Sequence, residues 1–79
     1  MDAVTYKGFE IHAAPYRLAE TGQWRIKIHI ARDRGNQREE KGFSGCNSYP
    51  TREEAVEHCF QLGRQIIDGQ VANCSVAYL

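Results

Sequence analysis

The chain has 79 residues, of which 42% are hydrophobic and 25% are charged. This composition is that of a small folded domain, and it excludes a disordered tail. The formal net charge is +0 at pH 7, so bulk charge does not indicate a nucleic-acid or membrane partner. The charges are nevertheless uneven, with eight Lys/Arg against six Asp/Glu in residues 1–50 and two against four in residues 51–79. We expect one domain, residues 1–79.

No apolar run approaches the ~18 residues of a membrane span, and residues 1–10 lack the features of a signal peptide. We therefore expect a cytoplasmic protein. The three cysteines are odd in number and lack CxxC spacing, so we expect reduced thiols. We find no catalytic motif, no metal motif and no nucleotide-binding loop, and we predict no cofactor.

The first predicted strand is Val4–Ala14. Apolar and polar residues alternate after Phe9, and the preceding Tyr6 is out of phase. A bulge at Lys7-Gly8 would reset the phase. The second strand, Gln23–Arg32, alternates cleanly, as expected for a strand with one buried face, and should be central.

A turn at 33–36 leads to a weaker third strand, Gln37–Ser48, which suits a sheet edge because it contains charges and glycines. Pairing of Arg32 near Gln37 would place Phe43 beside Ile26. Tyr49 should pack near the start of the following helix.

The clearest helix runs from Thr51 to Gly69. Thr51 with Glu54 forms a capping box, and Gly69 suits the position after the last turn. Gly63 lies in the apolar stripe and costs about 1 kcal/mol relative to alanine. The cost implies close approach of a large side chain, for which Trp24 is our candidate, or a merely tolerated glycine.

After the helix, Cys74, Val76 and Tyr78 alternate, which fits either a short last strand or a flexible or partner-bound tail. The predicted fold is α+β: a three-stranded antiparallel sheet in the order β-β-β-α, with the helix on one face. So small a core is marginal for stability, which favours a homodimer.

Four stretches in this order and spacing carry a resemblance: Tyr6–Ile11, Thr21–Trp24, Thr51–Ala55 and Gly63–Gly69. Together they resemble a family of small uncharacterised bacterial proteins. The resemblance implies a bacterial origin and a small α+β fold, with no assigned activity. The early Y-x-G-F-x-I stretch and the late Ile-Asp also bear a fainter similarity to small bacterial activators of haemolysin expression.

The main candidate site is a basic face of the sheet, opposite the helix. Phosphates could be held there and a base stacked at its rim on Tyr16. The alternative is a solvated face, because Glu10 and His12 could pair with Lys27 or Arg25 and no aromatic residue alternates with the cations. The candidate contact residues are Arg17, Arg25, Lys27 and His29, with Arg32, Arg34 and Arg38 flanking them from loops.

The other candidates have simpler interpretations. Two histidines, His12 and His29, are too few for a zinc site, and His58 suits a surface pair with Glu54. Cys59 should be a buried thiol. An acid at Asp68 opposes the helix dipole, and surface arginines or backbone groups could satisfy it. Cys46 and Cys74 could instead form an intermolecular disulfide.

We therefore expect a non-enzymatic interaction or regulatory module. It would bind an unknown protein partner, or a second copy of itself, through its sheet edge or C-terminal segment. The alternative is a nucleic-acid-binding domain that uses the basic sheet face. An enzyme is not expected, because no nucleophile–base pair has a recognisable spacing.

Overall fold

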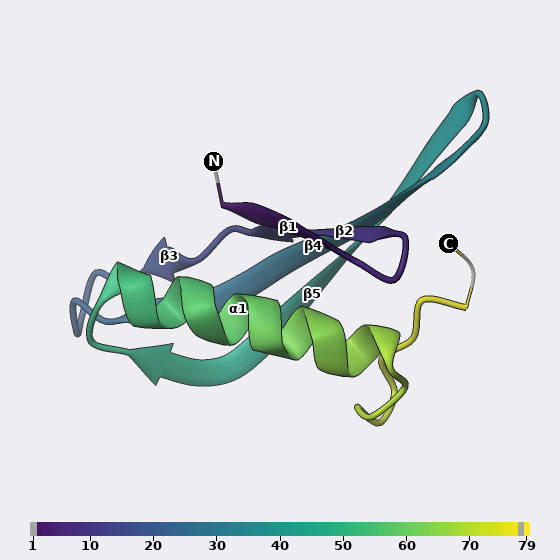
Figure 1. Ribbon diagram of the computed structural model, residues 1–79. Coiled ribbons are helices and arrows are strands. Elements are labelled where there is room, and N and C mark those ends of the chain that lie inside the picture. The colour runs from purple at the N-terminus through teal and green to yellow at the C-terminus, as the bar shows by residue number, and fades with distance from the viewer. Residues whose placement is uncertain (1, 78) are drawn as a thin grey trace.

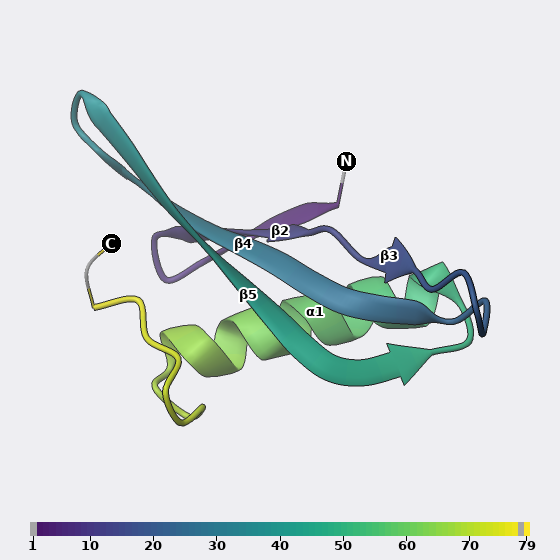
Figure 2. The same cartoon turned by 180° about the vertical axis from the view of Figure 1, so that it is seen from behind.

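The computed structural model describes residues 2–77 and 79. It shows one twisted antiparallel sheet with a single helix packed across one face (Figure 1, Figure 2). The fold is therefore α+β, as predicted, but the sheet has five strands where three were expected. The elements are β1 (Ala3–Tyr6), β2 (Phe9–Ala13), β3 (Tyr16–Arg17), β4 (Trp24–Arg34), β5 (Gln37–Tyr49) and α1 (Arg52–Ile67).

The N-terminal segment forms a hairpin, so the prediction of one bulged strand was wrong. Tyr6 pairs with Phe9 across a two-residue loop of Lys7 and Gly8, whose φ angles are 50° and 83°. Positive φ at both loop residues is the mark of the tight turn that matches the twist of antiparallel strands. The Lys-Gly pair therefore reverses the chain instead of resetting its phase.

β4 is the central strand, as predicted. β2 and the short β3 pair with successive parts of one edge of β4, and β5 pairs with the other edge. Pro15 separates β2 from β3, in keeping with its inability to donate to a ladder. Among the described residues, β5 pairs with β4 alone, which confirms its predicted position at the edge.

The register of the β4–β5 hairpin differs from the expected one. Arg34 pairs with Gln37, so the turn is Gly35-Asn36 and Phe43 lies opposite Ile28, not Ile26. The turn is two residues tighter than the four-residue signal indicated, because Gly35 takes a positive φ of 61°. An irregularity between Arg25 and Lys27 then adds length to β5 before it reaches Tyr49.

The helix begins and ends where the sequence predicts. The Thr51 side chain accepts a hydrogen bond from the backbone of Glu54 at 3.2 Å. Asp68 is the C-cap residue, and Gly69 follows with a φ of 76°. The backbone N–H of Gln70 reaches the carbonyl of Gln65 at 2.9 Å, which is the six-to-one bond of a Schellman ending.

The core lies between β4, β2 and one stripe of α1. Gly63 is required there, but the prediction of Trp24 as its neighbour was wrong. A Cβ at Gly63 would lie 2.6 Å from Cγ2 of Ile11, well inside van der Waals contact. The fully buried members of this core include Ile11, Ile28, Ile30, Ala55 and Cys59.

The C-terminal segment folds back onto the core. Residues 70–77 contain turns and no strand, so the short last strand, one of the two alternatives for this segment, is absent from the described part of the chain, and Tyr78 lies outside it. Leu79 is buried, and its backbone oxygen accepts hydrogen bonds from the guanidinium groups of Arg32 and Arg34. This segment is therefore occupied by intramolecular contacts.

Within the described residues, no helix is long and apolar enough to cross a membrane.

Candidate nucleic-acid interface

The two faces of β4 have opposite character, because side chains alternate along a strand. Ile26, Ile28 and Ile30 point to the helix and are buried. The intervening residues point to the opposite side, which we call the outer face. It includes Tyr16, Arg25, Lys27, His29, Ala31 and Asp33, together with their register neighbours Glu10, His12, Arg38, Glu40, Ser44 and Ser48.

One end of the outer face is an ion-pair network centred on Arg38. Its guanidinium lies 2.7 Å from a carboxylate oxygen of Glu10 and 3.2 Å from one of Asp33. The hydrogen bonds that Arg38 donates to Glu10 lower the pKa of Glu10. The pKa of Arg38 is raised, because Arg38 donates to both Glu10 and Asp33. Arg38 was expected to flank the basic face from a loop. It instead lies on β5 and is neutralised.

The other end of the outer face carries Arg25 and Lys27, which have no carboxylate partner among the described residues. The expected pairing of these cations with Glu10 or His12 is wrong, because both of those residues lie beside Arg38. Nε of Arg25 is also buried without a hydrogen-bond acceptor among the described residues.

The four predicted contact residues are not all on one face. Tyr16 lies opposite Arg25 in the register and therefore shares the outer face with it, and Tyr16 is 43% exposed. Arg17 lies opposite Trp24, which places it on the side of the sheet that bears the helix, because directly opposed residues share a face. Arg32 and Arg34 also belong to that side by alternation, on β4 and not in a loop.

The histidines face one another across β2 and β4, since His12 pairs with His29. Each has an acidic neighbour: Glu10 is 3.3 Å from His12, and Glu40 is 3.4 Å from His29. The negative charge of Glu40 also makes the surface around His29 less positive. No group of three or more His, Cys, Asp or Glu residues in the described chain could hold a metal ion.

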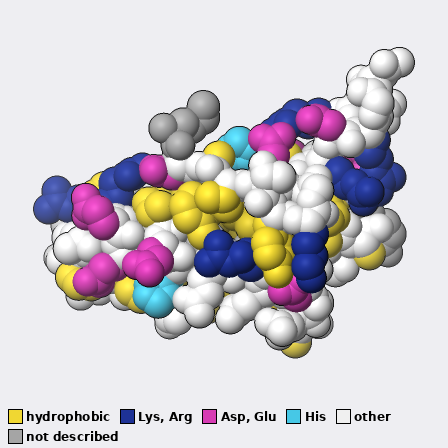
Figure 3. All heavy atoms as spheres, in the orientation of Figure 1, with side chains coloured by type: hydrophobic (Ala, Val, Ile, Leu, Met, Phe, Trp, Pro, Cys, Tyr) yellow, Lys and Arg dark blue, Asp and Glu magenta, His cyan; other side chains and the backbone are white. Residues whose placement is uncertain are grey.

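The helix offers a different surface. Its first turns bear Glu53, Glu54 and Glu57, all exposed, against one early cation, Arg52, and that cation lies against Asp2 in an ion pair. Figure 3 shows acidic side chains gathered over this part of the helix. Such a surface repels phosphates, so the outer face is the better candidate for contact with nucleic acid.

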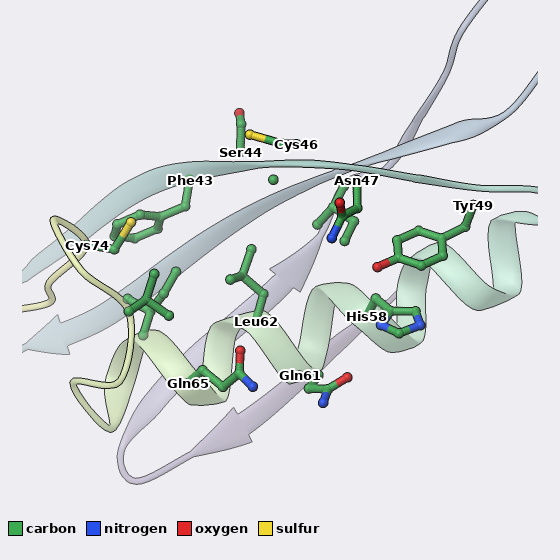
Figure 4. Close-up of a pocket in the computed structure, with 14 residues that line it drawn as sticks. Phe43, Ser44, Cys46, Asn47, Tyr49, His58, Gln61, Leu62, Gln65 and Cys74 are labelled. Carbon is green, nitrogen blue, oxygen red and sulfur yellow. The ribbon is translucent and has the colours of Figure 1, made fainter. Parts of the chain in front are cut away.

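A groove of about 470 Å³ lies between β5 and α1. Figure 4 shows Phe43 and Leu62 pointing into this space and Cys46 pointing away from it. Tyr49 stacks on His58 with ring centroids 4.1 Å apart. Tyr49 thus packs near the start of the helix as expected, whereas His58 stacks on it and forms no ion pair with Glu54.

The three cysteines lie in different environments. Cys59 is fully buried, as predicted, and burial raises the pKa of its thiol, which makes it a poor nucleophile. Cys46 is exposed, and Cys74 is partly buried among the core residues. A disulfide between molecules through Cys46 or Cys74 stays a prediction.

Asp68 is held by the β1–β2 turn. Nζ of Lys7 lies 2.6 Å from one carboxylate oxygen, and the Tyr6 hydroxyl donates to the other at 2.8 Å. These contacts lower the pKa of Asp68. The expected partners, arginines or the turn backbone, were wrong because the β1–β2 hairpin was not foreseen, and the hairpin brings both donors to the helix end.

The shape of the β4–β5 hairpin was not predicted from the sequence. β2 pairs with β4 only as far as Ala31, and β5 continues alone with β4 to Arg34. The two strands therefore project beyond the rest of the sheet (Figure 1, Figure 2). The sequence did contain an indication of this projection, because no residue from Arg32 to Glu40 is apolar. Such a stretch has no side chain that would pack into the core.

Comparisons with known proteins identify the family. No curated protein and no solved structure matches the chain. The family model described as "Transcriptional activator HlyU" matches residues 1–74. This match overturns the resemblance to an uncharacterised family and agrees with the fainter similarity to activators of haemolysin expression. The chain thus belongs to the HlyU transcriptional activator family, and it is a regulatory protein, not an enzyme.

Proposed function

We propose that this protein regulates transcription by binding duplex DNA through the outer face of its sheet. Arg25 and Lys27 contact backbone phosphates, Tyr16 packs against the sugar-phosphate edge, and His29 borders the contact. The observation that carries the proposal is that two cations on the outer face, the partly buried Arg25 and the exposed Lys27, lack carboxylate partners among the described residues. A family of transcriptional activators supplies the reason for such a face.

The choice of the sheet rests on the single helix of the described chain. A helix-turn-helix reader needs two helices, of which the second enters the major groove. Here α1 buries one stripe against the sheet and exposes glutamates in its first turns. A sheet that contacts phosphates with arginine and lysine agrees better with these charges.

The test is the salt dependence of binding to a mixed-sequence duplex, measured by fluorescence anisotropy. Removing one cation that neutralises a phosphate should reduce the slope of log K against log salt by about 1. We therefore expect Arg25→Ala and Lys27→Ala each to lower the slope by about 1. Arg64→Ala is the matched control, because Arg64 lies on α1, and its slope should equal that of the unmodified protein.

If the slopes of all three variants equalled that of the unmodified protein, the outer face would not be the surface that contacts phosphate. Absence of salt-sensitive binding by the unmodified protein would remove DNA binding altogether. The variant Arg17→Ala tests whether a cation on the helix-bearing side of the sheet also contacts phosphate. Its position opposite Trp24 leads us to expect a smaller change than for Lys27→Ala.

The proposal also gives the chain a place of action and an assembly. A regulator of this kind works in the bacterial cytoplasm, where the DNA is, and residues 1–79 act as one domain. Within the part of the chain that the structure describes, β5 pairs on one side only, so its other edge is where a second copy would pair. Light scattering at micromolar protein gives the mass of the particle, and a strict monomer with and without DNA would contradict pairing through this edge.

A further inference from the structure

The projecting tip of the β4–β5 hairpin is polar throughout. Every residue from Arg32 to Arg38 is exposed, and none is hydrophobic. No other strand of the described residues pairs with this part of the hairpin, so its shape depends on the ladder and the tight Gly35-Asn36 turn. In Figure 3 the end of the projection is neither apolar nor charged. The projecting tip therefore contributes little to the core, and its extension needs another explanation.

Several charged side chains near the tip have partners within the described chain. Arg34 donates to the backbone oxygen of Leu79, and Arg38 lies in ion pairs with Glu10 and Asp33. Asp33 thus shares this one cation with Glu10. The side chains of Asn36 and Gln37 make no hydrogen bond within the described residues. The tip thus presents two side-chain amides with free donors and acceptors.

The dimensions suit the major groove of DNA. Three residues of β4, Arg32–Arg34, extend beyond the pairing with β2, which gives a reach of about 10 Å at ~3.4 Å per residue. The major groove is about 12 Å wide and 8.5 Å deep, and it admits a two-stranded β-ribbon. The side-chain amide of an asparagine or a glutamine can form two hydrogen bonds with one adenine, at N6 and N7. The side chains of the tip therefore favour adenine.

We propose that the hairpin tip enters the major groove and that Asn36 and Gln37 recognise adenine there. This inference rests on the proposed DNA binding and divides the work between two surfaces. Arg25 and Lys27 supply affinity that does not depend on sequence, because phosphates carry no sequence information. The tip supplies sequence discrimination.

The first experiment is selection of sites from a randomised duplex pool by the full chain and by the variants Asn36→Ala and Gln37→Ala. We expect the unmodified protein to enrich a site that contains adenine, and each variant to lose about tenfold in preference for it over the pool. Affinity for the unselected pool should stay within about twofold, because phosphate contacts are intact. Gln61→Ala, on an exposed position of α1, is the matched control and should enrich the unchanged site.

The second experiment places 7-deazaadenine in the enriched site, which removes the major-groove acceptor N7 and keeps base pairing. We expect the unmodified protein to lose about tenfold in affinity and one of the two tip variants to lose nothing further. Sensitivity to 3-deazaadenine alone would place the tip in the minor groove and overturn the proposal. An unchanged melting temperature of each variant shows that the fold is intact.

The outcomes separate the two proposals. Salt-sensitive binding with no enriched site, or the same enriched site for both tip variants, overturns the inference and leaves the proposed function standing. Absence of any DNA binding by the unmodified protein overturns both.

Discussion

The two faces of β4 differ in what their side chains contribute. Ile26, Ile28 and Ile30 are buried between the sheet and α1, whereas the side chains of Lys27 and His29, which alternate with them, lie on the outer face. The inner face holds the fold together by excluding water. The outer face leaves two cations without carboxylate partners in the described chain. A single strand thus carries stability on one side and the proposed DNA contact on the other.

The largest effect should come from adjacent positions on these two faces. Ile28→Ala removes a fully buried side chain and should cost about 2–5 kcal/mol of unfolding free energy. Lys27→Ala should change stability by less than about 0.5 kcal/mol and weaken DNA binding instead. Denaturant unfolding and anisotropy on both variants give the comparison. A large loss of stability in Lys27→Ala would contradict the division of β4 into a stabilising face and a DNA-binding face.

The next effect concerns the close approach of α1 to β2. Gly63→Ala would place a Cβ 2.6 Å from Ile11, and such overpacking costs about 1–3 kcal/mol. In the presence of Ile11→Ala the added methyl has room, and the helix gains about 1 kcal/mol from replacing glycine. A double-mutant cycle by denaturant unfolding should therefore show a favourable coupling between the two substitutions. Additive effects would mean that the backbones move apart freely.

An accessible thiol on the outer face gives a kinetic prediction. Cys46 is exposed, and Cys59 is buried. Duplex DNA at saturating concentration and low salt should slow maleimide alkylation of Cys46 several-fold, because bound DNA would cover its neighbours Ser44 and Ser48. The rate should recover at high salt, where phosphate contacts weaken. An alkylation rate that is indifferent to DNA would argue against contact with this face.

The smallest effect concerns Asp68 and depends on pH. The hydrogen bond from Lys7, followed by that from Tyr6, holds the pKa of Asp68 below its usual value of 3.8. A lowered pKa in the folded state means that the contribution to stability is present above pH ~4 and is lost as pH falls through the folded value. We expect Asp68→Asn to lower the melting temperature at pH 7, by an amount that shrinks below pH ~4.

The control for that measurement is Glu20→Gln, which removes the same charge from an exposed loop. Its melting temperature should follow that of the unmodified protein at every pH. A deficit in Asp68→Asn that stayed constant down to about pH 2 would mean that the carboxylate charge has no part in holding the β1–β2 turn to the helix.

Elements with a strong local signal were predictable. Thr51, Glu54 and Gly69 mark the ends of α1 chemically, and the alternation of β4 identifies its buried face. The β1–β2 hairpin was not predicted, because Lys7 takes a positive φ that is uncommon for a lysine. The register of β5 was missed because its central part has few apolar residues to fix it.

The candidate site was predictable only in part for the same reason. Arg25, Lys27 and His29 share a face because they alternate on one strand. The face on which Arg17 lies depends on the pairing of β3 with β4. A strand of two residues leaves no recognisable pattern in the sequence, so this position was not predictable. The freedom of Arg25 and Lys27 depends on Arg38 lying beside Glu10, a contact 28 residues apart in the chain.

The most direct test of the account is a map of amide chemical shifts in labelled protein titrated with duplex DNA at low and high salt. We predict shifts at Tyr16, Arg25, Lys27 and His29 and at the hairpin tip, with those on the sheet fading as salt rises. Shifts confined to the exposed side of α1, or to the groove between β5 and α1, would contradict the central claim that the outer face binds DNA.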